Sequence, residues 1–446
     1  MLELQHIRER VLSNLTGINL RKLLKSLYVD KYKRYNKVQR LFILDGVSIN
    51  ASVVLTSGIF LSGYVVLLGG SDFLTALLNN SMAWASIAAI FCSLVFERMR
   101  KRKKVIVTLH FLARMLVCSI IFLPLILKNN NITLPILACM VIAGNILWSF
   151  FSIGSVVWMM DAVPQETRKD FIYDRMFWLR ISFTITTIVM GFILDAFNKT
   201  YTGFFIVFVT SLVFSVTDTV ILMNIEEGES QVNIDRKINF KNIFEPWGNK
   251  EYRKFLIFVF LFYVIILSSV SYNPLYLIKY MNFDYKFIST ITVISYIFMI
   301  VSTSYWKKAE WKRGIKYVLR MGALFIILEV LVYAFLTRRT YFLLYIAPVL
   351  SGIGNSGFNI AILNYRYDLM PENNKTIYEA WFTTIYGLGS MLAPIIGDYM
   401  ITNIPLIKNI LFEYSNFQLT YLITFLLNAL VIFLFFGIKE KGGIIR

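Results

Sequence analysis

Ionisable side chains inside long apolar runs are the residues of this chain that could do chemistry. A charged group at the centre of a membrane-spanning helix costs about 2.5–3.5 kcal/mol on insertion scales. Such groups are therefore candidates for sites that bind a substrate or carry an ion or proton. Asp45 stands near the start of its run, where it either begins a helix at the lipid headgroups or helps to move a proton or cation. Arg114 and Glu329 stand mid-run and are expected to form structural pairs. Asp218 comes late in its run, toward the expected cytoplasmic side.

Amide and aromatic side chains in the same runs are the candidates for contact with a solute. Asn355 and Asn359 are four residues apart, so they share one helix face. Tyr272 and Asn273 precede Pro274, which frees a backbone carbonyl and can kink a helix. Hydrogen bonding between neighbouring helices is the competing role for each amide. The expected cavity lining is Asn50, Asn145, Trp148, Tyr272, Asn273, Asn355 and Asn359.

The sequence offers few residues for a catalytic or metal-binding site. The chain has two histidines, and its three cysteines all lie in apolar runs, where we expect reduced thiols packed as small hydrophobes. The G-x-G-x-x-G pattern of Gly352, Gly354 and Gly357 lies inside an apolar run and lacks the preceding strand of a nucleotide site, so it favours close helix packing. We expect no enzyme activity, no metal and no cofactor.

Composition indicates an integral membrane protein. Of 446 residues, 57% are hydrophobic and 16% charged, and the mean hydropathy is +0.62. Soluble chains carry about 25% charged residues. About 20 apolar residues cross the hydrocarbon of a bilayer. Twelve runs approach that length, at roughly 41–68, 73–96, 104–127, 133–160, 171–194, 202–223, 253–280, 285–305, 315–336, 341–369, 377–402 and 414–438.

A polar break divides these runs into six and six. The expected units are a basic segment 1–40, a bundle 41–223, a central loop 224–252, a bundle 253–438 and a tail 439–446. The basic segment is not of signal-peptide type. Its leucines interleave with Lys and Arg, which suits either a helix lying on an anionic membrane surface or a solvated tail.

Lys and Arg are distributed unevenly between the two sides of the membrane. Of 45 such residues, most lie in the N-terminal segment, the loops after even-numbered runs and the C-terminal tail. The opposite side holds Lys128, Lys199, Lys279, Lys286, Arg338, Arg339 and Lys408, and Arg114 lies on neither side. The positive-inside rule therefore predicts both termini and the central loop in the cytoplasm. Topology explains the net charge of +18, and nucleic-acid binding is not needed.

The two halves repeat short patterns. Asp161, Pro164 and Arg168 recur in the second half as Asp368, Pro371 and Lys375. The sequence Gly-Phe-Ile-Leu-Asp ends the fifth run at 195, and Pro-Ile-Ile-Gly-Asp stands in the eleventh at 398. Parallel repeats of six helices, with a substrate site at their interface, characterise one large transporter architecture.

The loop after the second run resembles the signature of the major facilitator superfamily. That family typically has G-x-x-x-D-R-x-G-R-R-K, and this chain reads S-L-V-F-E-R-M-R-K-R-K over 93–103. Glu97, Arg98 and the basic triplet match, while Ser93 and Arg100 replace the glycines. A weaker second copy surrounds Glu310, and the resemblance covers about residues 38–440.

The resemblance implies an all-α integral membrane protein with the fold of that superfamily, in which two six-helix bundles are related by a parallel repeat. It implies alternating access around a cavity lined by runs one, four, seven and ten. It also implies a cytoplasmic gate of Glu97, Arg98, Asp161 and Arg168, in which Arg98 pairs with Asp161 and Glu97 faces a helix N-terminus. Simple helix termination at the headgroups is the competing role for these charges.

The expected function is secondary active transport of a small organic solute, with the direction open. A proton or sodium ion could couple transport, and the expected unit is a monomer in the inner (plasma) membrane of a bacterium. Sparse cavity charge favours neutral or amphipathic solutes. The fifth run lacks the Gly-Pro motif of drug/proton antiporters, and a similar pattern appears at 387–397. The alternative function is a membrane sensor or assembly partner that keeps the fold without transport.

Overall fold

The structure is a computed structural model, and it describes residues 35–88, 101–127, 130–164, 167–227, 244–371, 375–407 and 412–436. Its described residues form helices joined by turns, without strands. The first half contains α4 (Lys37–Leu55), α5 (Gly58–Leu67), α6 (Asp72–Asn79), α7 (Ser81–Trp84), η2 (Ala85–Ala88), α9 (Lys103–Ser119), η3 (Ile120–Phe122), α10 (Leu123–Ile126), α11 (Asn130–Ala162), α12 (Arg168–Ala196) and α13 (Tyr201–Met223).

The second half has a matching series of helices. It contains α14 (Glu245–Gly248), α15 (Lys250–Val270), α16 (Asn273–Leu275), the π-helical turn η5 (Tyr276–Tyr280), α17 (Tyr285–Arg313), α18 (Ile315–Ala334), η6 (Tyr341–Tyr345), α19 (Ala347–Asp368), α20 (Lys375–Asn403) and α21 (Ser415–Phe436). Over the described part of the chain, ten helical stretches are long and apolar enough to cross a membrane. The protein is therefore a multi-pass membrane protein.

Helix ends show how local sequence sets these elements. Asn36 caps α4 in a capping box with Gln39, and Asn249 caps α15 by accepting from the backbone N–H of Tyr252. A side-chain oxygen at this position satisfies a backbone donor that has no partner within the helix. The first expected run is broken into α4 and α5 at Gly58, whose φ is +54°. The eighth expected run, 285–305, is shorter than the helix that forms there: α17 continues past residue 305 and ends at Gly314, where φ is +82°.

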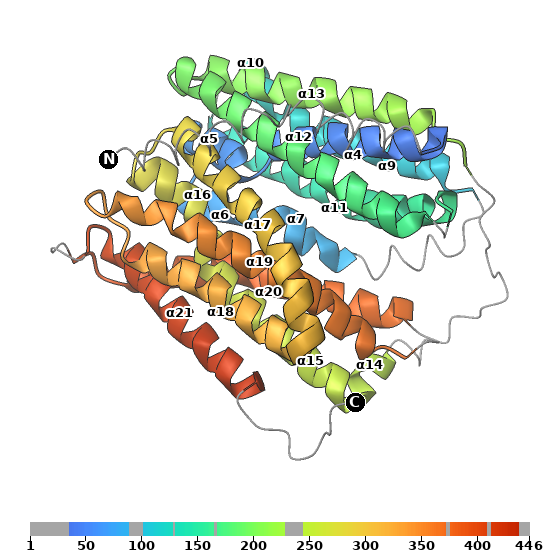
Figure 1. The fold of residues 1–446 in the computed structure, drawn as a ribbon. Helices are drawn as coiled ribbons and strands as arrows, with labels where there is room; N and C mark the ends of the chain where they lie inside the picture. The colour runs from blue at the N-terminus through green and yellow to red at the C-terminus, as the bar shows by residue number, and fades with distance from the viewer. Residues whose placement is uncertain are drawn as a thin grey trace, which may run out of the picture.

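Each half packs around its own hydrophobic core. The largest buried cluster comes from residues 252–432, with Ala76 added from the first half. Two further clusters come from 35–225, with Tyr285 added from the second half. Figure 1 shows the blue-to-green helices α4, α9, α11, α12 and α13 in one layer and the orange and red helices α18, α19, α20 and α21 in another.

Equivalent helices make equivalent contacts in the two halves. In the first half, α4 packs against α12 and α13, and α9 packs against α11. In the second, α15 packs against α20 and α21, and α18 packs against α19. These pairs hold the same places in each series, which is what a parallel six-helix repeat requires.

The halves touch through two main interfaces. Helix α12 packs against α17, and α20 packs against α6, α7 and η2. Glycines allow the close approach: a Cβ on Gly387 would lie 2.9 Å from the backbone N of Ile87, and one on Gly191 would lie 3.1 Å from the backbone O of Tyr285. Helices α5, α6 and α16, which also touch, gather at one end of the molecule (Figure 1).

Candidate functional site

A cluster of buried charged residues joins α4, α9, α12 and α13 inside the first half. Asp45 and Arg114 are 5% and 2% exposed, and His110 and Asp218 are 0% exposed. Arg175 completes the cluster from α12. Buried charges of this kind are costly unless they are paired or functional. The cluster is therefore the main candidate for the chemistry of this chain.

Asp45 and Arg175 form an ion pair between α4 and α12. An Nη2–H of Arg175 donates to Oδ2 of Asp45 at 3.0 Å, and its Nε–H donates to the backbone O of Phe42 at 3.0 Å. The other carboxylate oxygen of Asp45, Oδ1, has no hydrogen-bond partner in the described part of the chain. Asp45 thus does more than begin a helix.

His110 and Asp218 form a second pair between α9 and α13. Nε2 of His110 lies 3.0 Å from Oδ2 of Asp218, and Nδ1 lies 3.1 Å from Oγ1 of Thr219. Phe151 packs on the imidazole, with ring centroids 4.8 Å apart. The pair is sealed from solvent on all sides, since both side chains are fully buried.

Arg114 is held by hydroxyl groups and backbone oxygen. Its Nη2 donates to Oγ and O of Ser52 at 2.7 and 3.0 Å and to Oγ1 of Thr56 at 2.8 Å. Ser211 and Ser215 on α13 complete the shell at 3.3 and 3.4 Å. The structural partners expected for Arg114 are therefore hydroxyl groups, and its guanidinium carbon lies 5.9 Å from the centroid of Trp148.

A cavity of about 210 Å³ opens next to the Asp45–Arg175 pair. Both charged residues line it, together with the polar groups of Asn50 and Ser152 and the ring of Trp148. Asn50 is fixed by donating from Nδ2 to the backbone O of Leu179 at 2.7 Å. The cavity therefore combines a paired charge, hydrogen-bonding groups and an aromatic face, as small-solute sites do.

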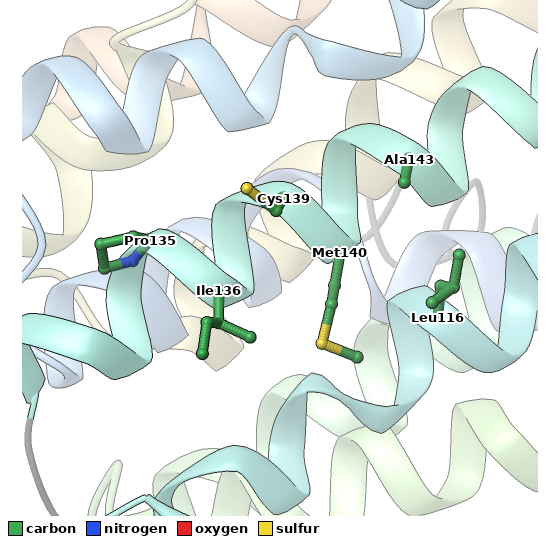
Figure 2. A pocket seen from close by; sticks show the side chains of 6 residues that line it. All are labelled: Leu116, Pro135, Ile136, Cys139, Met140 and Ala143. Carbon is green, nitrogen blue, oxygen red and sulfur yellow. The ribbon is translucent and has the colours of Figure 1, made fainter.

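A larger depression, of about 370 Å³, lies between α9 and α11 and has a different character. Ile136 and Met140 of α11 and Leu116 of α9 point toward it in Figure 2, and Pro135, Cys139 and Ala143 complete its lining. All six are apolar or weakly polar, and Cys139 is exposed. The depression has the surface expected of a helix pair facing lipid, and it lacks the convergent polar groups of a solute site.

The remaining residues expected to line the cavity are spread over several helix contacts. Asn145 donates to Oγ of Ser81 at 2.6 Å. The hydroxyl of Tyr272 donates to the backbone O of Pro394 at 2.9 Å, and Asn273 accepts from the hydroxyl of Tyr421 at 2.7 Å. These contacts hold α11 to α7, the turn between α15 and α16 to α20, and α16 to α21.

In α19, Asn355 bonds back to Ser351 of the same helix, while Asn359 is exposed. Glu329 lies on α18, which packs against α19. The geometry thus brings Asn50 and Trp148 together with Asp45 and leaves the other expected residues at separate places. Glu97 and Arg98 lie outside the described residues, as do the side chains of Asp161 and Arg168.

Sequence reasoning missed His110, Arg175 and the serine shell. Spacing offers a signal for them in retrospect, since His110 and Arg114 are four apart on α9. Ser211, Ser215 and Asp218 likewise share a face of α13. Apolar periodicity hides this signal, because the polar groups face inward between apolar neighbours.

Cross-half polar contacts cluster at the end of the molecule that carries the connections after odd-numbered apolar runs. Asp195, at the end of α12, accepts from the backbone N–H groups of Tyr285 and Lys286 at 3.1 and 2.7 Å. Lys199 pairs with Asp284 at 2.9 Å. Asp72 of α6 pairs with Lys279 of η5 at 2.5 Å. These contacts fasten the halves together at this end.

Comparison with known proteins decides the family. A family model described as the MFS_1 like family matches residues 71–414. The chain belongs to this family. Membership makes it a secondary transporter of the major facilitator class rather than an enzyme. A search of curated protein sequences gives no match.

Solved structures agree with the fold. The crystal structure of a D323A mutant of the nucleoside transporter NupG matches 91% of this chain and 100% of its own, with a TM-score of 0.70 and 16% identity. A D-xylose–proton symporter matches with a TM-score of 0.66 and 13% identity, over 89% of this chain and 96% of its own. At such identities the likeness establishes the fold.

Proposed function

We propose that this member of the MFS_1 like family moves a small organic solute by alternating access, and that the cavity beside Asp45 and Arg175 is part of its solute site. The observation that carries the proposal is the buried ion pair at the wall of a cavity with polar groups and an aromatic ring. A buried pair of this kind contributes little net stability, so a role in binding accounts for it better than a role in folding.

The distribution of Lys and Arg indicates the side of the membrane to which the proposed cavity opens. The uneven distribution of Lys and Arg favours a cytoplasmic location for both termini. In that orientation the fastened end is the outer one, and the cavity opens inward. A bacterial homologue of the iron transporter ferroportin supports this direction. Its inward-facing structure matches 90% of this chain and 98% of its own, with a TM-score of 0.67 and 14% identity. Its outward-facing structure matches 90% of this chain and 99% of its own, with a lower TM-score of 0.59 and 15% identity.

Opening and closing then require the two halves to move as units. We assign these units to residues 41–223 and 253–438, with 224–252 as the connecting loop. Arg98 and Asp161 remain our proposal for the cytoplasmic gate, with Glu97 and Arg168 beside them. We further propose that the working unit is a monomer in the inner membrane.

The lining indicates the class of solute. The charges of Asp45 and Arg175 cancel, so the cavity suits an uncharged or zwitterionic molecule. Asn50 and Ser152 offer hydrogen bonds, and Trp148 offers a face for stacking. Hydroxylated solutes with an apolar face, such as nucleosides and pentoses, meet these requirements. Two of the similar solved structures are named as transporters of such solutes: NupG carries nucleosides, and the symporter carries D-xylose, a pentose.

Solute counterflow in proteoliposomes tests the proposal. Vesicles with purified protein, loaded with one unlabelled solute from a panel of nucleosides, pentoses and amino acids, should take up the labelled form of at least one. Asp45→Asn and Arg175→Gln should lower that exchange. Glu251→Gln, which breaks the exposed Glu251–Lys254 pair, is the matched control and should not. Exchange unchanged in both cavity variants would refute the proposed site, and no exchange of any solute by the wild type would refute transport.

A further inference from the structure

We propose that the last turns of α17 carry a binding site for one anionic phospholipid, with its phosphate held by Lys308 and Lys312. An acyl chain of the lipid lies along the apolar residues that precede these lysines on the same face of the helix. The site is separate from the cavity beside Asp45 and Arg175, and lipid binding there does not depend on transport. Its basis is an exposed helix face that is apolar over one stretch and basic over the next.

The length of α17 brings its last turns to the level of the lipid headgroups. The helix spans Tyr285–Arg313, and Asp195 caps its first residues at the opposite end of the molecule. At 1.5 Å per residue, Lys308 and Lys312 lie about 35 and 40 Å from the first residue along the axis. The hydrocarbon of a bilayer is about 30 Å thick, and the headgroup layers extend it to about 40–45 Å. These two lysines therefore reach the headgroups of the far leaflet.

One face of these last turns is covered by α19. Trp306 is 2% exposed, and its Nε1–H donates to the backbone O of Ile353 at 2.8 Å. Glu310, four residues later on the same face, accepts from Nδ2 of Asn364 at 3.0 Å. This face is therefore occupied by protein, and its carboxylate already has a partner.

The opposite face of the same turns is exposed and basic. Lys308 and Lys312 are four residues apart, so they stand one above the other, and both are exposed. Trp311 beside them is 87% exposed, whereas Trp306 is almost fully buried. Over 306–320 the chain has six Lys or Arg and a single acid, which faces α19. The exposed face therefore carries a net positive charge.

Toward the middle of the helix, this face continues as an apolar stripe. Three of its side chains are 42–68% exposed: Ile297, Ile300 and Val301. Tyr305 follows at 60% exposed, and it stands in one row with Val301 and Lys308 because a helix turn has 3.6 residues. Tyr is enriched where hydrocarbon meets headgroups, which is the place of Tyr305 between the stripe and the lysines. The face thus changes from apolar to aromatic to basic along the helix.

The order of these residues matches the order of groups in an anionic phospholipid. An acyl chain fits the apolar stripe, the glycerol region lies beside Tyr305, and the phosphate lies between the amino groups of Lys308 and Lys312. Basic residues next to a membrane-spanning helix attract anionic lipids, and Trp is favoured at the same depth. A choline headgroup also has a phosphate, but it would bring a second cation to the lysines. In the orientation proposed above, the lipid belongs to the cytoplasmic leaflet.

A general attraction of this basic chain to anionic lipid is the competing explanation, and a second pair of lysines provides the control. Lys250 and Lys254 are also four residues apart and exposed, in the first turns of α15. Glu251 lies between them and pairs with Lys254 at 3.0 Å, so this surface is less positive. Replacing either pair of lysines removes the same charge from the protein.

Native mass spectrometry of the delipidated full-length protein in detergent tests the site. The wild type should retain phosphatidylglycerol more strongly than phosphatidylcholine with the same acyl chains. The double variant Lys308→Gln, Lys312→Gln should weaken the affinity for phosphatidylglycerol about 25-fold, at about fivefold per lysine, and leave that for phosphatidylcholine unchanged. The control variant Lys250→Gln, Lys254→Gln should keep the wild-type affinity for both lipids. Size-exclusion chromatography checks that each variant is folded.

Three results would overturn the inference. The first is an affinity for phosphatidylglycerol that is the same in the Lys308, Lys312 variant as in the wild type. The second is an equal loss in both double variants, which would show a general attraction of charge. The third is displacement of phosphatidylglycerol by inorganic phosphate at the same concentration, which would assign the site to a free anion. None of these results bears on solute transport.

Discussion

Asp195 and Lys286 join the two halves of the molecule, because a carboxylate oxygen of Asp195 accepts from the backbone N–H of Lys286 at 2.7 Å. The same carboxylate accepts from Tyr285, so it caps the N-terminus of α17 from the other half of the chain. A carboxylate is stabilised at a helix N-terminus by unpaired N–H groups and by the helix dipole. This contact closes one end of the transporter.

Asp195→Ala should therefore loosen the closed end. Loss of a helix cap costs about 1 kcal/mol, which shifts a two-state equilibrium roughly fivefold toward the state open at this end. A cysteine placed at Ser289, which is fully buried against this interface, should react faster with a water-soluble maleimide in the variant, in a background without native cysteines. Glu413→Gln is the control, because its ion pair with Arg338 lies within the second half. An equal rate in both variants would contradict the role of Asp195.

Gly387 makes the second interface possible. An alanine Cβ there would lie 2.9 Å from the backbone N of Ile87, so α20 must move away from η2. Overpacking of this kind costs about 1–3 kcal/mol, and here the cost falls on the contact between the two halves. Gly387→Ala should raise the same Ser289 labelling rate. Gly389→Ala, on the same helix, meets its nearest atom at 3.4 Å and should leave the rate unchanged; a similar rise in both would show that the effect is not specific to the interface.

Ser52 supports Arg114 and is expected to matter for stability. Its Oγ accepts from the guanidinium at 2.7 Å, so Ser52→Ala removes a partner of a buried charge. Leaving such a group under-satisfied costs about 1–3 kcal/mol, which should lower the temperature of thermal unfolding in detergent. Ser62→Ala is the control: Ser62 is also buried, and its Oγ has no hydrogen-bond partner among the described residues. Equal melting of the two variants would contradict the assigned role.

Orientation can be measured at the cavity itself. A single cysteine at Ser152 should react with a membrane-impermeant maleimide in inside-out vesicles and be protected in right-side-out vesicles, because the cavity is proposed to open to the cytoplasm. Cys139, which lies in the apolar depression, provides a control that should react poorly from either side. Preferential labelling from the outside would reverse the assigned orientation.

Much of the fold follows from the sequence, because hydropathy and helix signals are local. Apolar runs predict the membrane helices, and the polar break predicts a boundary between the two repeats near 224–252. The motif around Glu97 led to the family that the comparison confirms. Hydropathy predicts helix ends poorly where a helix continues past the apolar run, as α17 does to Arg313. The charged stretch after Trp306 looks like a loop there, yet its Lys, Ala, Glu and Arg residues are good helix formers and continue α17.

The site was harder to predict, because it depends on which helix faces meet. Asp45, Arg114 and Asp218 stand out as charges in apolar runs, and the fold brings them together as one cluster. Their partners do not stand out in the same way. Arg175 follows a charged loop and resembles a headgroup anchor, and His110 is a single residue in a run whose neighbours are apolar. Pairing across α4, α9, α12 and α13 is a property of packing, which spacing within one run does not contain.

The central claim is that solute passes through the cavity beside Asp45 and Arg175, and filling that cavity tests it most directly. Counterflow should be measured in proteoliposomes with Ser152→Trp, which places a bulky ring in the cavity, and with Cys139→Trp, which fills the apolar depression of Figure 2. We predict that Ser152→Trp abolishes exchange of the solute carried by the wild type and that Cys139→Trp keeps it. Wild-type exchange by a correctly folded Ser152→Trp protein would contradict the account.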